Sequence, residues 1–152
     1  MSTSNVSSAH VDQAASVVSG ALLRNPKIDW VLPENADVFG NPVYSGLTSA
    51  RATTKVKIGG PSGGVGGLLN VKQGHLAFAV AAAGNLAGWN AADGLCRMIG
   101  GDSVPTNYPF VTRLFDSSNI TTIKQTPAEG ATYDWFGTPT YQAPYLKAWK
   151  VS

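Results

Sequence analysis

Three short apolar segments recur at regular intervals in the first half of the chain. They cover residues 28–32, 54–58 and 76–82, and each stops abruptly at Gly, Pro, Asn or Ala. Helix-compatible sequence lies between them, which is typical of an α/β fold with a mostly parallel sheet. Because such sheets bind ligands at the carboxyl ends of their strands, the residues that follow these segments are the first candidates for function.

Helical periodicity is clearest in residues 10–25 and 83–99, and a shorter helix is expected at 68–72. Residues 83–99 carry one apolar stripe, formed by Leu86, Trp89, Ala92, Leu95, Cys96 and Ile99. Residues 35–50 are expected to be irregular, because they contain two glycines and a proline. An extended edge segment is expected near residues 108–116.

The composition fits one globular domain and excludes several functions. The chain has 152 residues, 43% of them hydrophobic, and eleven Lys and Arg against nine Asp and Glu. It has no basic run, so we expect no nucleic-acid partner. Its one cysteine, Cys96, excludes an internal disulfide and a cysteine-rich metal site, and its helical stripe predicts a small buried apolar side chain. No signal peptide is recognised, so the chain is expected to be intracellular or a mature or excised piece of an exported protein.

The chain is expected to comprise a flexible lead-in at 1–9, an α/β domain at 10–123 and a C-terminal tail at 124–152. The tail is rich in proline and aromatic residues, namely Tyr133, Trp135, Phe136, Tyr141, Tyr145 and Trp149. A tail of this composition is expected to pack on the domain or on a partner.

Catalytic patterns are not recognised. Residues 59–67 are dense in glycine, but they match neither G-x-G-x-x-G nor a P-loop, which favours a flexible turn over a phosphate site. His10 and His75 are far apart, and no nucleophile, carboxylate pair or metal-ligand spacing is apparent. We therefore expect a protein that is not an enzyme and has no cofactor or metal, with a nucleotide-binding enzyme as a distant alternative.

Five short motifs follow one another in a characteristic order. They are Asn25-Pro26-x-Ile28-Asp29-x-Val31 with Asn35, Val56-x-Ile58-Gly59-Gly60, Val71-x-x-Gly74-x-Leu76-Ala77, Gly88-Trp89-x-Ala91-Ala92-Asp93, and Gly101-x-x-Val104-Pro105. Together they resemble the C-terminal half of the type I periplasmic sugar-binding proteins, over about residues 10–123. The segment Leu114-Phe115-Asp116-x-x-Asn119 resembles the part that follows the last helix in these proteins.

The resemblance implies a three-layer lobe, here incomplete, in which helices flank a mostly parallel sheet. In the family two such lobes are joined by three crossovers and close on a sugar by hinge motion. The implied function is that of the substrate-binding component of an ABC importer, of which this chain is the C-terminal portion. Its implied partners are a sugar or polyol and the transporter permease. The implied location is the periplasm or the outer side of a membrane.

Four residues correspond to the family's ligand positions or lie close to them. Asn35 matches a ligand-binding asparagine or aspartate, and Asp37 lies nearby. Ser62 stands where the family has an aspartate, and Asn85 follows the third strand, where a glutamine or asparagine is usual. Sugar hydroxyls both donate and accept hydrogen bonds, which suits such side chains. For Asn35, capping of the following helix is an equal alternative.

A complete family member is about twice as long, so a first lobe would be missing here. The Trp89 stripe would then be exposed and would favour a homodimer, with a second copy replacing the missing lobe. A second hypothesis follows: a truncated solute-binding-protein-like domain that binds no ligand and acts by self-association or as an interaction module. Trp30 and Trp89 are expected to be core or lobe-contact residues rather than sugar platforms.

Overall fold

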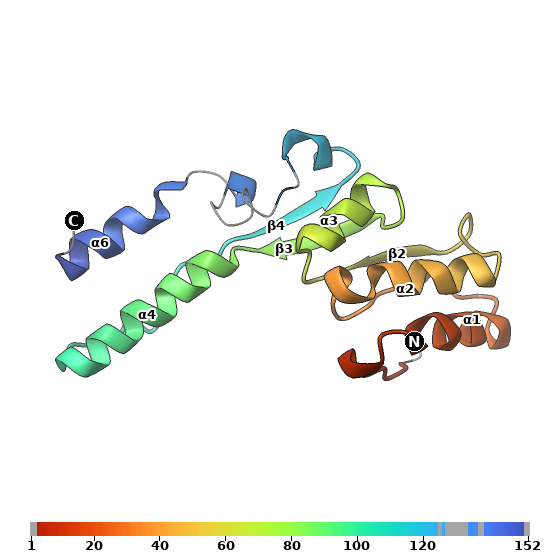
Figure 1. Ribbon diagram of the computed structural model, residues 1–152, viewed down its shortest axis with the longest axis horizontal. Coiled ribbons are helices and arrows are strands. Elements are labelled where there is room, and N and C mark those ends of the chain that lie inside the picture. Colours follow the sequence, from red (N-terminus) through yellow and green to blue (C-terminus); the bar gives the residue numbers. More distant parts are fainter. Residues whose placement is uncertain (1–2, 125, 127–133, 137–138, 151–152) are drawn as a thin grey trace. The chain divides into compact units, whose positions relative to one another are not determined.

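The computed structural model of the protein describes residues 3–124, 126, 134–136 and 139–150 (Figure 1). Its contacts form two compact units, and each is described by itself. Unit 1 comprises Met1–Ala81 and Leu114–Gln125, and unit 2 comprises Ala82–Arg113 and Thr126–Ser152. The chain therefore passes from one unit to the other three times.

Unit 1 contains three helices and a sheet whose strands follow the order β1-β2-β3-β4. Its elements are η1 (Ser8–His10), α1 (Gln13–Arg24), β1 (Trp30–Val31), α2 (Ala36–Ser49), β2 (Lys57–Gly60), α3 (Val65–Lys72), β3 (Phe78–Ala82), β4 (Thr112–Asp116) and η2 (Ile120–Thr122). The pairs β1–β2 and β2–β3 are parallel, with Trp30 opposite Lys57 and Gly59 opposite Phe78. The predicted α/β class with a mostly parallel sheet flanked by helices is confirmed.

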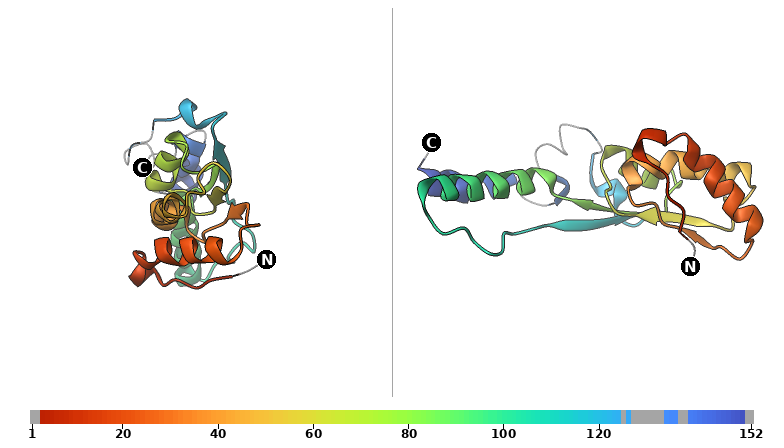
Figure 2. Two further views of the ribbon diagram at one scale, coloured as in Figure 1. Left: turned by 90° about the vertical axis from the view of Figure 1, so that its right-hand side faces the viewer. Right: turned by 90° about the horizontal axis from the view of Figure 1, so that it is seen from below.

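Helices α1, α2 and α3 lie side by side on one face of the sheet, with α2 in contact with both neighbours (Figure 2). For α2 and α3 this placement follows from the right-handed β-α-β crossovers expected between strands that are added in one direction, whereas α1 precedes β1 and packs against α2. The largest buried side chains of the core are Leu47, Ile58, Leu68, Leu76 and Phe115. On the other face, the rings of Trp30 and Phe78 are 5.9 Å apart and partly exposed. A third layer of the predicted lobe has no counterpart among the described residues of unit 1.

Residues 36–49, expected to be irregular, form the regular helix α2 with Pro42 inside it. The two glycines of this segment allow close packing rather than a break. A Cβ at Gly46 would lie 2.6 Å from the carbonyl oxygen of Ala15 on α1, and one at Gly40 would lie 3.3 Å from Asn70 on α3. Tertiary packing therefore outweighs the low intrinsic helix propensity of these residues.

Unit 2 is built on the long helix α4 (Gly84–Gly100), and its other elements are η3 (Asp134–Phe136), η4 (Pro139–Gln142) and α6 (Ala143–Trp149). One expectation for α4 is wrong: Cys96 is exposed rather than buried. The expected exposure of the stripe holds over part of its length, since Trp89 is partly covered by the C-terminal segment. The exposed large apolar residues of α4 are Leu95 (58%), Met98 (70%) and Ile99 (79%). Tyr133, also expected to pack, lies outside the described residues.

None of the helices in the described part of the chain has the length and hydropathy that a membrane-spanning helix needs.

Candidate functional site

Asn35 lies just after β1, at the carboxyl edge of the sheet, and is the N-cap of α2. Its Oδ1 accepts hydrogen bonds from the backbone amides of Asp37 (3.0 Å) and Val38 (3.1 Å). The capping role considered from the sequence is therefore present. Among the hydrogen bonds of the described residues, none uses its Nδ2 amide group.

Asp37 connects the start of α2 to the start of α3. Its Oδ1 accepts a hydrogen bond of 2.9 Å from the amide of Gly67, in the first turn of α3. A Cβ at Gly64 would lie 2.8 Å from the same carboxylate, and one at Gly66 would lie 2.9 Å from it. The glycine-dense segment is therefore needed for this close approach. Because the carboxylate occupies the amino end of α3, where a phosphate would bind, the nucleotide-binding alternative loses its support.

Ser62 links the loop that follows β2 to the start of α2. Its carbonyl oxygen accepts hydrogen bonds from the amides of Asp37 and Gly64, both at 3.1 Å, and the neighbouring Pro61 carbonyl accepts one from Ala36 at 2.8 Å. The backbone of Ser62 is left-handed, with φ of 58°, and its side chain is exposed. A non-glycine residue in this region is uncommon and costs about 1 kcal/mol.

The structure thus brings three of the four predicted site residues together, and we call Asn35, Asp37 and Ser62 the strand-end cluster. The fourth, Asn85, lies in the first turn of α4 and belongs to unit 2. The cluster offers an amide donor, a carboxylate oxygen and a hydroxyl that does both, a combination suited to polyhydroxylated ligands. Nowhere in the described ranges do three or more His, Cys, Asp or Glu side chains gather as metal ligands.

A second polar group lies in unit 2, around the buried carboxylate of Asp93. It accepts hydrogen bonds from the Tyr108 hydroxyl (2.7 Å), from Nε of Arg97 (2.7 Å) and from Nε1 of Trp149 (2.8 Å). The Tyr108 hydrogen bond, followed by that of Arg97, lowers the pKa of Asp93 from 3.8 to about 2. One turn earlier, Asn90 donates to the Pro109 carbonyl at 2.8 Å and accepts from the Tyr145 hydroxyl.

Aromatic packing attaches α6 to the same face of α4. The rings of Trp89 and Trp149 are stacked, with centroids 5.2 Å apart and planes at 4°. Tyr145 is buried beside Leu86 and lies 5.8 Å from the Trp89 ring. The anchoring role of Asn90 and Asp93 was not predicted from the sequence. The sequence does contain a signal for this role. Two polar residues lie three positions apart within an apolar helical stripe, and the chain ends in an aromatic tail.

No protein-family model and no curated protein matches the chain. Several solved structures are similar to the chain. A solute-binding protein of an ABC transporter from Agrobacterium vitis, bound to alpha-D-tagatopyranose, has a TM-score of 0.70 at 23% identity, over 84% of this chain and 41% of that protein. Another from the same organism, with bound D-fucose, has a TM-score of 0.68 at 16% identity, over 86% and 43%.

A periplasmic solute-binding protein of an ABC transporter from Actinobacillus succinogenes, with bound D-allose, has a TM-score of 0.62 at 21% identity. It is matched over 74% of this chain and 39% of its own length. The chain thus spans about two fifths of the length of these structures. The predicted resemblance is confirmed for the fold: the chain has the fold of part of an ABC-transporter solute-binding protein.

Proposed function

We propose that the chain is the C-terminal portion of the substrate-binding component of an ABC importer and binds a sugar or polyol in a hinge cleft. The strand-end cluster is the observation that carries the proposal. It lies at the carboxyl ends of β1 and β2, where open α/β sheets bind ligands. The similar solved structures contain tagatose, fucose and allose, which supports a sugar as the ligand class.

Each residue of the cluster has a distinct role in this proposal. Nδ2 of Asn35 donates to a sugar oxygen, Oδ2 of Asp37 accepts from a sugar hydroxyl, and the Ser62 hydroxyl can do either. Asn85, in the first turn of α4, is the fourth proposed ligand residue. Binding involves no covalent chemistry and no cofactor, so the protein is not an enzyme.

The proposal further assigns the transporter permease as the protein partner. It places the protein in the periplasm, or on the outer side of a membrane. The first lobe of the fold comes either from a preceding polypeptide or from a second copy of the chain.

The test measures sugar affinity by calorimetric titration in variants that keep the backbone contacts. Asn35→Asp retains the capping Oδ1 but loses the amide donor, and Ser62→Gly retains the left-handed backbone but loses the hydroxyl. We expect each to weaken binding by about tenfold, the effect of one lost hydrogen bond. Asn41→Asp, the same change at an exposed position of α2, is the control and should bind as the parent does. Unchanged affinity in both cluster variants would refute the site.

A second candidate function is supported by two observations. The cluster uses Oδ1 of Asn35 and of Asp37 for internal hydrogen bonds, and α4 exposes three large apolar residues, Leu95, Met98 and Ile99. A truncated domain that binds no sugar and self-associates would show these features. Under this alternative, sedimentation velocity should show a dimer that Ile99→Asp converts to a monomer. A monomeric parent chain would exclude it.

A further inference from the structure

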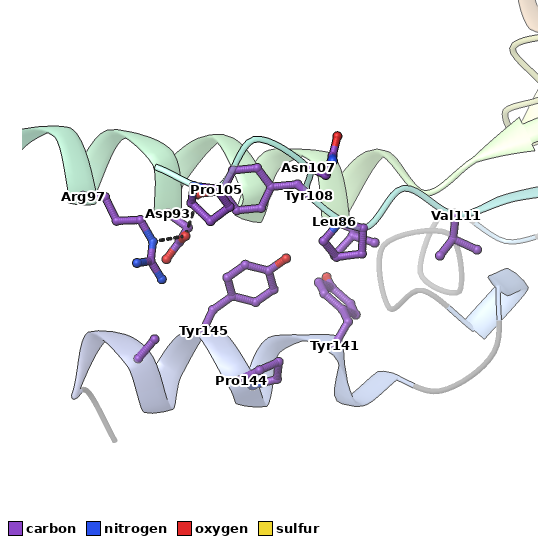
Figure 3. Close-up of a pocket in the computed structure, with 12 residues that line it drawn as sticks. Leu86, Asp93, Arg97, Pro105, Asn107, Tyr108, Val111, Tyr141, Pro144 and Tyr145 are labelled. Atoms are coloured by element: carbon purple, nitrogen blue, oxygen red, sulfur yellow. Dashed lines mark hydrogen bonds and ion pairs between the residues drawn. The ribbon is translucent and has the colours of Figure 1, made fainter. Parts of the chain in front are cut away.

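Unit 2 contains a pocket of about 470 Å³ between α4, the 105–111 segment and the C-terminal helix (Figure 3). On α4 it is lined by Leu86, Asp93 and Arg97. The opposite wall is formed by Tyr141, Pro144, Tyr145 and Ala148, which share one side of the C-terminal segment because they are spaced three or four residues apart. Small-molecule sites have volumes of roughly 300–1,000 Å³, so the pocket is large enough for one small ligand.

The lining favours a flat, apolar body. Three tyrosines, at positions 108, 141 and 145, and three prolines, at 105, 109 and 144, make up half of the twelve lining residues. Figure 3 shows the Tyr141 and Tyr145 rings rising from the C-terminal segment toward Leu86 and Pro105. An aromatic ring of a ligand that lies between these side chains would gain offset-stacked or edge-to-face contacts with the tyrosine rings, in addition to the burial of its apolar surface.

The polar end of the pocket is cationic where it meets solvent. Arg97 and Asp93 are the two charged residues among the described lining residues, and they form an ion pair of 2.7 Å. The Asp93 side chain is only 4% exposed, whereas that of Arg97 is 34% exposed. Nε of Arg97 donates to Asp93, and the guanidinium also forms a side-chain hydrogen bond with Tyr108. Because a guanidinium has five N–H donors, its remaining donors are available to another acceptor. In Figure 3 the guanidinium lies at the end opposite Val111.

From this arrangement we propose that the pocket binds a small aromatic carboxylate. Its ring lies between the tyrosines and prolines, and its carboxylate contacts the terminal amino groups of Arg97. A guanidinium fork matches a planar carboxylate, and the exposed positive pole of the ion pair provides the charge complementarity. The pocket belongs entirely to unit 2, so this inference does not depend on sugar binding at the strand-end cluster.

The test titrates the protein with 3-phenylpropionate and with its neutral counterpart 3-phenylpropan-1-ol, followed by two-dimensional NMR. We expect saturable shifts for the indole of Trp149 and for pocket residues, and affinity for the alcohol about tenfold weaker. Absence of saturable shifts at about 10 mM carboxylate would refute the proposal. Equal affinity for acid and alcohol would refute the role of Arg97 and with it the ligand class.

Two variants and one control variant complete the test. Ala148→Trp fills the pocket from α6 without removing any contact of Asp93, and we expect it to weaken binding at least about tenfold. Ala143→Trp, the same change on α6 outside the lining, is its control. Arg97→Gln should abolish the preference for acid over alcohol while the amide spectrum of unit 1 stays unchanged. Parent-like binding by Ala148→Trp would place the ligand elsewhere and overturn the proposal.

Discussion

Replacing Gly64 by alanine tests how the strand-end cluster is held together. Gly64 is the N-cap of α3 with φ of −82°, which alanine adopts without backbone strain. The added Cβ would lie 2.8 Å from the carboxylate of Asp37, a separation that such atoms do not tolerate. The carboxylate must therefore move away and release the amide of Gly67. The variant removes this hydrogen bond without changing either of its partners.

The expected loss of stability is about 2 kcal/mol. A hydrogen bond to a charged group contributes about 1.5–3 kcal/mol, and the exposure of Asp37 favours the lower end of that range. Replacing glycine by alanine at an N-cap adds a few tenths of a kcal/mol. For a chain of this size the loss lowers the melting temperature by roughly 5 °C.

The assay is urea unfolding followed by circular dichroism, combined with hydrogen exchange of the Gly67 amide. Gly64→Ala is measured alone and in an Asp37→Ala background, where no carboxylate stands in the way. In the Asp37→Ala background we expect Gly64→Ala to cost only the N-cap effect, about 0.5 kcal/mol. The free-energy costs of Gly64→Ala in the two backgrounds should therefore differ by at least about 1 kcal/mol. An equal cost in both backgrounds, within about 0.3 kcal/mol, would refute the reasoning.

Three further predictions concern other parts of the chain. The hydrogen bond from Tyr108, followed by that from Arg97, lowers the pKa of Asp93 from 3.8 to about 2. The ionised Asp93 therefore contributes its full stabilisation of the fold above pH 3.8, and this stabilisation is lost as the pH falls through 2. Acid titration of tryptophan fluorescence should show this loss in the parent and not in Asp93→Asn; identical acid profiles would contradict it. Gly46→Ala should destabilise unit 1 by about 1–3 kcal/mol in urea unfolding, because the Cβ would lie 2.6 Å from the rigid carbonyl of Ala15; a parent-like midpoint would argue against this contact. Cys96 should react with a thiol reagent in the native protein nearly as fast as in urea, since it is exposed, and strong native protection would show that it is covered.

Most of the order of the elements could be predicted from the sequence, because the strand and helix periods are strong local signals, but helices α2 and α6 were not predicted. The exact strand limits could not. The strand expected at 28–32 is reduced to Trp30–Val31, and the one expected to stop at residue 58 continues through Gly59 and Gly60. Both glycines are buried by close approach: a Cβ at Gly59 would lie 2.3 Å from the Phe78 ring. Such contacts depend on residues distant in sequence, which local patterns do not report.

For the candidate site, the strand ends could be located from the sequence. Which polar atoms form internal hydrogen bonds and which stay available could not be predicted. Asn35 was considered both as a cap and as a ligand residue, and the structure assigns its Oδ1 to capping. Asp37 was chosen only for its proximity to Asn35, and its hydrogen bond to the amide of Gly67 explains the glycine-dense loop. The burial of Cys96 was wrongly predicted, since one apolar stripe was assumed on α4 where only part of it meets α6. Ligand contacts and domain limits stay predictions.

The central claim is that the strand-end cluster binds a sugar, and a thermal melt of the chain against a panel of pentoses, hexoses and polyols tests it most directly. A ligand at ~100 times its dissociation constant adds about 2.7 kcal/mol, which should raise the midpoint by roughly 5 to 10 °C. We predict such a shift with at least one sugar, reduced by Ser62→Gly and preserved by Asn41→Asp. No shift with any compound of the panel would contradict the account and favour the self-associating domain.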